Sequence, residues 1–323
     1  MPPWRFIRAY VKSMRLYYAF ITGIAGWIGV SYYHYIRPDS IDHGRGAVIL
    51  VILFLSWGIN QIINDYLGLP EDRINAPNRP MVTGELHPGG ALAVSGALLA
   101  GAGAVSWFLN PWAVAPLALG VLLNVLYEYA KGWSLLGNVV FGFCIAMCTA
   151  YGFAAAGPLP EPLFIRSRVS GVLLVALLNG LMTYYTYFKD YKGDLAAGKR
   201  TFVVKYGINV ARYVGVLGAF LPTLAVVMLN TIGWLPTETV EYPDTFIFCC
   251  VMTLFLQLWT AVLFFKHPVG TRTYLSLATN IRACVAGQIT LIARFNDILA
   301  LYLLCASYVF IGFLFDRYKD TKS

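Results

Sequence analysis

The stretch NDYLGLPEDRINAPNRP, residues 64–80, directly follows the apolar run GAVILVILFLSWGINQII at residues 46–63. An apolar run of this length can cross the roughly 30 Å hydrocarbon core of a bilayer as one helix. Asp65 then lies in the last turn of that helix, where a carboxylate faces the negative end of the helix dipole. A bound cation would offset both charges, so the stretch predicts a ligand site at a membrane surface.

The composition of the whole chain indicates a membrane protein. Of the 323 residues 58% are hydrophobic and only 12% are charged, and the mean hydropathy is +0.64. Soluble domains carry roughly a quarter charged residues. The basic N-terminal segment interleaves aromatic and charged residues and lacks a cleavage site after a short apolar core, so we expect no removable signal peptide.

Nine segments of about 20 residues are apolar enough to span a membrane. They lie at 16–36, 46–66, 89–109, 111–130, 135–156, 169–189, 208–230, 246–266 and 296–316. The segment 273–294 carries Arg282 at its middle, which favours an interfacial or re-entrant segment over a tenth span. The sequence therefore predicts an all-α polytopic membrane protein, a nine-transmembrane-helix bundle, with residues 1–323 as a single domain.

Lysine and arginine residues are unevenly divided between the two faces of this bundle. The N-terminus and the loops after even-numbered spans carry most of them, which predicts a cytoplasmic N-terminus and cytoplasmic motif loops. With nine spans Arg317 would lie on the opposite face, and a tenth span would bring it back. The net charge of +8 suits anionic lipid or a phosphorylated substrate. Nucleic acid is excluded as a partner because no soluble basic surface remains.

The six cysteines show no CxxC spacing and mostly lie in apolar runs. They predict neither a disulfide framework nor a zinc site. We expect small core residues.

A second acidic stretch, LMTYYTYFKDYKGDLAAGKRT at residues 181–201, repeats the first arrangement. Asp190 and Asp194 lie four residues apart at the end of the sixth span, on the same face of the membrane as the first stretch. Carboxylates that share a site with substrate phosphates are typical of Mg²⁺. Basic side chains near both stretches would contact the phosphates: Arg73, Arg79, Lys189, Lys199 and Arg200.

These two stretches, together with YEYAK from Tyr127 to Lys131, resemble the two aspartate-rich motifs and the Y-x-x-x-K element of the UbiA superfamily of intramembrane prenyltransferases. The resemblance implies a helical bundle around a central cavity that opens to the membrane. It also implies Mg²⁺-dependent ionisation of an isoprenyl diphosphate, followed by attack of an aromatic or other lipophilic acceptor.

The resemblance also implies roles for particular residues. The catalytic carboxylates are Asp65, Asp72, Asp190 and Asp194, and these four together with Asn64 and Glu71 form the expected Mg²⁺ site. The expected substrate-binding residues are Asn64, Arg73, Arg79, Tyr127, Lys131, Lys189, Lys199 and Arg200.

The first motif departs from the family pattern at one position. The family commonly carries an aspartate where this chain has Gly68, and Pro70 follows shortly after. We expect Gly68 to end the helix as a left-handed cap with positive φ. Two alternatives stay open: Glu71 supplies the missing carboxylate, or the site is one ligand short.

An allylic cation needs an electron-rich wall. Near the second motif the aromatic residues that could provide it are Tyr184, Tyr185, Tyr187 and Phe188, although an aromatic belt at the membrane interface explains them too.

Three other functions are compatible with the same residues. A terpene cyclase of the same superfamily would ionise the same donor without an acceptor. A transporter would also hold charges near helix ends. An inactive regulatory relative would keep the bundle without the chemistry. The acceptor, the donor chain length and the oligomeric state are left open by the sequence.

Overall fold

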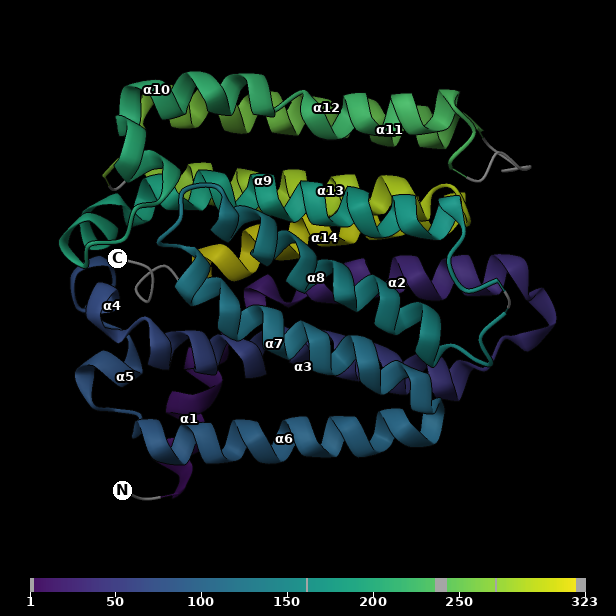
Figure 1. The fold of residues 1–323 in the computed structure, drawn as a ribbon, viewed down its shortest axis with the longest axis horizontal. Coiled ribbons are helices and arrows are strands. Elements are labelled where there is room, and N and C mark those ends of the chain that lie inside the picture. The colour runs from purple at the N-terminus through teal and green to yellow at the C-terminus, as the bar shows by residue number, and fades with distance from the viewer. Residues whose placement is uncertain (1–2, 161, 236–242, 271, 318–323) are drawn as a thin grey trace.

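The computed structural model describes residues 3–160, 162–235, 243–270 and 272–317. These residues form long helices that run side by side, connected by short helices and loops (Figure 1). The helices are α1 (Pro3–Met14), α2 (Ala19–Ile36), α3 (His43–Leu67), α4 (Leu69–Asn75), α5 (Pro80–Thr83), α6 (Pro88–Leu109), α7 (Val114–Ala130), α8 (Leu136–Ala155), α9 (Arg166–Ala196), α10 (Phe202–Gly218), α11 (Leu221–Thr231), α12 (Pro243–Lys266), α13 (Thr273–Ile292) and α14 (Asp297–Arg317). The all-α, polytopic fold is confirmed.

Nine helical segments in the described part of the chain are long and apolar enough to cross a membrane. They are α3, α6, α7 with its preceding turn, α8, α9, α10 with α11, α12, α13 and α14. The expected span at 16–36 corresponds to α2, which is not among them. Its C-terminal half carries Tyr32, Tyr33 and His34, although it lies alongside the other long helices (Figure 1).

The expectation of an interfacial or re-entrant segment at 273–294 is wrong. Residues 273–292 form α13, a continuous helix, and its apolar window Leu275–Ile292 is 89% buried inside the bundle. Arg282 is accommodated by α14: its Nε donates to the Tyr308 carbonyl at 3.1 Å, and its guanidinium lies 4.1 Å from the Tyr308 ring centroid. The charge is therefore placed against a polar acceptor and an aromatic face.

Because residues 273–292 form a helix of the bundle, the described chain ends at a different end of the bundle from the one expected. Phe315, near the end of α14, packs edge-on against Tyr17 and Tyr18 beside the start of α2, with ring centroids 5.2 and 5.7 Å apart. The end of α14 thus lies at the same end of the bundle as α1 and α4 (Figure 1). The expectation that Arg317 lies at the end of the bundle opposite the two motifs is therefore wrong.

Close contacts between backbones form the centre of the bundle. A Cβ at Gly142 would lie 2.2 Å from the Ala176 carbonyl oxygen of α9, and one at Gly152 would lie 2.0 Å from the Gly26 carbonyl oxygen of α2. Small residues allow such close helix packing in membranes. α8 is therefore held between α2 and α9, which carries the second acidic stretch.

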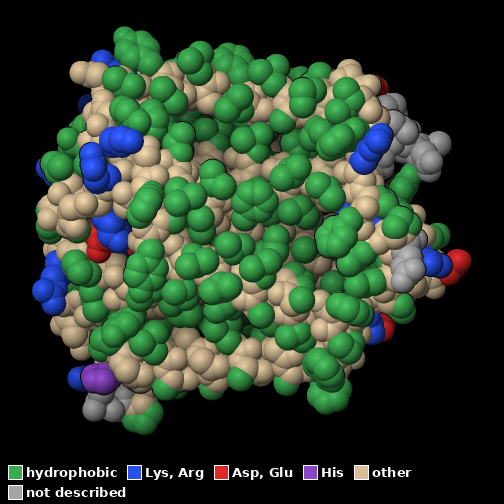
Figure 2. Space-filling view, viewed as in Figure 1, with side chains coloured by type: hydrophobic (Ala, Val, Ile, Leu, Met, Phe, Trp, Pro, Cys, Tyr) green, Lys and Arg blue, Asp and Glu red, His purple; other side chains and the backbone are tan. Residues whose placement is uncertain are grey.

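The surface agrees with a membrane location. In Figure 2 hydrophobic side chains cover the broad face of the molecule, while Lys and Arg gather at its two ends. Exposed apolar side chains include Phe108 and Leu217, which are 87% and 71% exposed. A belt of this kind faces lipid rather than water. All six cysteines are free, but the expectation that they are core residues is wrong for Cys305, which is exposed.

Candidate functional site

The first acidic stretch begins where α3 passes into α4. The Gly68 amide donates to the Asn64 carbonyl at 2.8 Å, and Gly68 has φ −93° and ψ 14°. The expected left-handed cap is wrong, because the chain enters the next helix at Leu69 instead of reversing. α4 then places Glu71 and Asp72 in its first turn, where both are buried and where the helix dipole favours negative charge.

Asn75 joins this stretch to the second one. Its Oδ1 accepts from the Gly193 amide at 2.8 Å, and its Nδ2 donates to the Asp190 carbonyl at 3.1 Å. A Cβ at Gly193 would lie 2.2 Å from Asn75 Nδ2, so only glycine leaves room for the amide. These contacts hold α4 against the end of α9 and bring the two motifs together.

Two arginines neutralise the first group of carboxylates. Arg15 forms an ion pair with Asp65, and Arg79 forms one with Asp72 while lying 3.6 Å from Asp65. Gln61 donates to Asp65 at 3.0 Å. Burial raises the pKa of Asp72, an effect that the charge of Arg79 partly offsets. Burial alone would lower the pKa of Arg79, but Asp72 and Asp65 raise it above its ordinary value.

Two lysines pair with the other buried carboxylates of the site, which are Asp194, Glu128 and Glu71. Lys131 Nζ lies 3.8 Å from Asp194 Oδ1 and 3.9 Å from Glu128 Oε2. Lys199 Nζ lies 3.1 Å from Glu71 Oε1. Burial alone would lower the pKa of Lys131, but the nearby carboxylates, Glu128 first among them, raise it above its ordinary value. Lys131 therefore stays charged in the folded protein.

These groups surround a polar cavity at the end of the bundle. Its volume is about 130 Å³. It receives residues from α3, α4, α7, α8, α9 and α13 and from the turn before α2. Its lining includes Arg15, Tyr17, Tyr18, Trp57, Gln61, Asn64, Asp65, Gly68, Glu71, Asp72, Asn75, Arg79, Tyr127, Glu128, Lys131, Phe141, Lys189 and Asp190.

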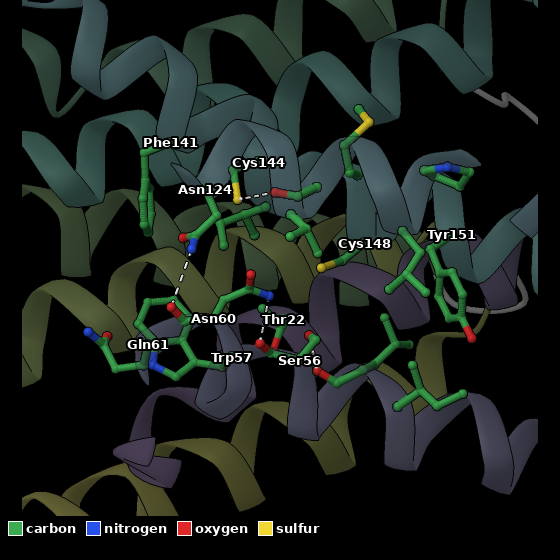
Figure 3. A pocket seen from close by; sticks show the side chains of 18 of the residues that line it. Thr22, Ser56, Trp57, Asn60, Gln61, Asn124, Phe141, Cys144, Cys148 and Tyr151 are labelled. Carbon is green, nitrogen blue, oxygen red and sulfur yellow. Dashed lines mark hydrogen bonds between the residues drawn. The ribbon is translucent and has the colours of Figure 1, made fainter. Parts of the chain in front are cut away.

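A second, more apolar cavity continues from the first toward the middle of the bundle. Its volume is about 60 Å³, and it shares Trp57, Gln61, Asn64 and Phe141 with the polar cavity. Figure 3 shows it between α2, α3, α7 and α8, where the Asn124 amide donates to the Asn60 carbonyl at 3.3 Å. The two cavities together offer a charged end and an apolar extension.

The structure gathers most of the residues expected at the site. Asn64, Asp65, Glu71, Asp72, Arg79, Tyr127, Lys131, Lys189 and Asp190 line the polar cavity. Asp194 and Lys199 do not line it but pair with side chains that do. Arg73 and Arg200 are exposed and do not line the cavity.

The four aromatic residues expected to form a wall of the site do not lie at the cavity. Tyr184 and Tyr185 donate to the Ala211 and Gly215 carbonyls of α10 at 2.7 and 2.6 Å, so they hold helices together. None of Tyr184, Tyr185, Tyr187 and Phe188 lines the cavity, and all four are buried in the core. The aromatic rings of the cavity come instead from Tyr17, Tyr18, Trp57, Tyr127 and Phe141.

Three residues of the site were missed by reasoning from the sequence: Arg15, Asn75 and Glu128. Arg15 belongs to the basic N-terminal segment, which indicated only membrane orientation. Glu128 lies inside YEYAK, between the two residues that drew attention. Asn75 and its partner Gly193 both lie within the quoted motifs, and their polar and small side chains were the available signal.

Several oxygens of the site are unpaired and could bind Mg²⁺. In the described part of the chain no three His, Cys, Asp or Glu side chains are close enough to hold a metal by themselves. Yet Asp65 Oδ2, Asn64 Oδ1 and both carboxylate oxygens of Asp194 are buried without a hydrogen-bond partner. Hard oxygens that only partly enclose a cation fit Mg²⁺ when substrate phosphates complete its shell.

Comparison with known proteins identifies the relatives of this fold. A profile of the UbiA prenyltransferase family matches residues 19–280. The digeranylgeranylglyceryl phosphate synthase of Thermococcus kodakarensis is 26% identical over 74% of this chain and 86% of its own length. That of Halobacterium salinarum strain R1 is 34% identical over 61% of this chain and 69% of its own.

Solved structures share the arrangement of helices. A UbiA homologue from Archaeoglobus fulgidus bound to GPP and Mg²⁺ has a TM-score of 0.63 at 13% identity, over 94% of this chain and 99% of that one. A UbiA homologue from Aeropyrum pernix K1 has a TM-score of 0.66 at 15% identity, over 86% and 96% of the two chains.

Proposed function

The chain belongs to the UbiA prenyltransferase family, and from this membership we propose a specific reaction. The protein ionises an isoprenyl diphosphate in the polar cavity and transfers the prenyl group to a lipophilic acceptor, with Mg²⁺ as cofactor. The single observation that carries the proposal is the joining of a cavity lined by paired carboxylates and cations to an apolar extension.

The cations of the polar cavity bind the diphosphate. Arg15, Arg79, Lys131 and Lys189 line it, and the first three of them pair with carboxylates of the site. Arginine and lysine side chains of this kind contact phosphate oxygens. Negative charge that develops on the leaving diphosphate is stabilised by groups already in place.

The Mg²⁺ ligands belong to the two facing motifs. We assign them to Asn64, Asp65, Glu71 and Asp72 on one side and to Asp190 and Asp194 on the other. When bound, Mg²⁺ neutralises charge on the departing diphosphate as a Lewis acid. The buried oxygens of Asp65 and Asp194 without hydrogen-bond partners support this assignment.

The apolar extension binds the prenyl chain. Trp57 and Phe141 line both cavities and lie where the chain leaves the diphosphate site. Aromatic faces at this junction attract an allylic cation and exclude water from it.

The names of the relatives support one class of acceptor. The curated relatives are named digeranylgeranylglyceryl phosphate synthases, which favours a phosphorylated glycerol lipid among lipophilic acceptors over an aromatic one. The basic residues gathered at the motif end (Figure 2) suit an acceptor with an anionic head. This end of the bundle, with both described chain ends, faces the cytoplasm in the proposed orientation.

The altered first motif favours one alternative. With Gly68 in place of an aspartate, a terpene cyclase that quenches the cation internally uses the same cavity without an acceptor.

One experiment tests the proposal. Purified protein is incubated with Mg²⁺ and geranyl, farnesyl or geranylgeranyl diphosphate, with and without aromatic and glycerol phosphate lipid acceptors. Diphosphate release that depends on an acceptor supports the transferase, and a cyclic product formed without acceptor supports the cyclase. No release with any donor would overturn both.

A further inference from the structure

A carboxylate from another helix lies next to Gly68, the position at which the family commonly has an aspartate. A Cβ added at Gly68 would lie 3.8 Å from Glu128 Oε2, the one side-chain atom within 4 Å of it among the described residues. Gly68 follows α3, whereas Glu128 lies in the last turn of α7. The approach arises from helix packing and is invisible in the sequence.

We propose that Glu128 supplies the carboxylate that the first motif lacks, and that it binds the Mg²⁺ held with the substrate diphosphate. This inference rests on the proposed function. Glu128 lines the polar cavity together with Gly68, Asp65 and Asp72, so its side chain shares the space of the motif that it completes.

The burial of Glu128 indicates that a partner is missing. The residue is 6% exposed, and its Oε2 has no hydrogen-bond partner. The nearest ammonium on this oxygen, that of Lys131, lies 3.9 Å away. Lys199 donates to the Glu128 carbonyl at 2.8 Å and not to the carboxylate. A buried carboxylate oxygen without a hydrogen bond is costly, so the site accommodates a further cation.

Glu71, the substitute expected from the sequence, is the weaker candidate. Its Oε1 also has no hydrogen-bond partner, but it lies 3.1 Å from Lys199 Nζ, closer than any ammonium to Glu128 Oε2. Its charge is therefore balanced by Lys199, as those of the assigned ligands Asp65 and Asp72 are by arginines. It is also not among the side chains that reach the Cβ position of Gly68.

An aspartate at position 68 would place its carboxylate close to that of Glu128, so either one could supply the same ligand. Gly68→Asp in the native chain would place a second carboxylate against Glu128, where like charges repel. In Glu128→Gln the same substitution would restore the lost charge at nearly the same point. The double variant Gly68→Asp/Glu128→Gln thus distinguishes a ligand from a merely structural residue, because misfolding cannot produce a gain.

The test measures Mn²⁺ affinity by EPR of the free ion, using the full chain saturated with geranylgeranyl thiolodiphosphate, which does not ionise. Glu128→Gln should weaken Mn²⁺ binding by about tenfold or more, and the double variant should return it to within about threefold of the native value. The matched control is Glu85→Gln, since Glu85 is an exposed carboxylate paired with Lys12. It should bind Mn²⁺ as the native chain does.

The outcomes separate the inference from the function on which it rests. Native Mn²⁺ affinity in Glu128→Gln, or a loss that the double variant does not repair, would overturn the role of Glu128 alone. Absence of Mn²⁺ binding by the native chain with the analogue would overturn the proposed function, and the inference with it.

Discussion

At the scale of single residues, the site depends on buried charges that pair across helices. Arg79 contacts Asp72 of α4 and lies 3.6 Å from Asp65 of α3, while Lys131 follows α7 and reaches Asp194 of α9. Each cation thus pairs with carboxylates of helices to which it does not itself belong. Removing one partner leaves an uncompensated buried charge, which is more costly than losing an exposed pair.

The carboxylates of the second motif should be essential for turnover. We expect Asp190→Asn and Asp194→Asn each to lower turnover by about a hundredfold or more, because charge stabilisation at the leaving group is lost. The measurement is the rate of diphosphate release at saturating donor and Mg²⁺. Near-normal turnover in both variants would contradict the assignment of this motif.

The two arginines of the DRINAPNR segment should differ sharply. Arg79→Gln should raise the KM for the diphosphate by about tenfold or more, because Arg79 lines the cavity and one charge-assisted contact to phosphate is lost. Arg73→Gln is the matched control, since Arg73 is exposed and does not line the cavity. Equal effects of the two substitutions would show that the cavity seen here is not the diphosphate site.

At the scale of elements, α4 is a short helix that is held in place by its neighbours. Its seven residues are too few to be stable alone. The side-chain amide of Asn75 both donates to and accepts from the backbone of α9. Lys199, which follows α9, forms an ion pair with Glu71 of α4. The relative position of the two motifs therefore depends on this clamp.

A methyl group at the clamp should separate the motifs. Gly193→Ala places a Cβ 2.2 Å from Asn75 Nδ2, so the amide must move and its hydrogen bonds are lost. We expect a loss of about 1–3 kcal/mol in unfolding free energy together with a lower kcat. Gly171→Ala in the same helix is the control, because nothing lies within 4 Å of its Cβ. Thermal unfolding in detergent compares the two, and a Gly193→Ala protein as stable as the control would contradict the clamp.

At the scale of the whole molecule, the bundle has a charged reactive end and an apolar body. α13 and α14 bring the chain back so that Phe315 packs at the motif end beside Tyr17 and Tyr18. Arg317 then adds its charge to the end that already carries the motifs. The excess of basic residues at this end keeps the proposed cytoplasmic orientation.

Cysteine labelling checks this arrangement. In a background without native cysteines, Lys192→Cys and Arg317→Cys should both resist an impermeant thiol reagent in intact cells. Asp39→Cys, in the exposed turn after α2, should be labelled, because it lies at the other end of the bundle. Labelling of Arg317→Cys but not of Lys192→Cys would instead place the end of α14 on the side of the membrane opposite the motifs.

Helix periods, membrane-length apolar runs and the two acidic motifs are local properties, and the sequence alone determined them. It predicted an all-α membrane bundle with two acidic motifs on one face, and the structure brings Asp65, Asp72 and Asp190 to one cavity. A run of about 20 apolar residues can satisfy its backbone in lipid only as a helix, so its fate depends little on its neighbours.

Only the tertiary structure decided which side chains meet at the cavity. It put Arg282 against α14 and made 273–292 a buried helix. It turned Tyr184 and Tyr185 toward α10 instead of the cavity, and it set Glu128 beside Gly68 across two helices. Such contacts depend on the rotation and depth of each helix relative to its neighbours. Those are fixed by packing among residues distant in the chain, which local sequence patterns do not record.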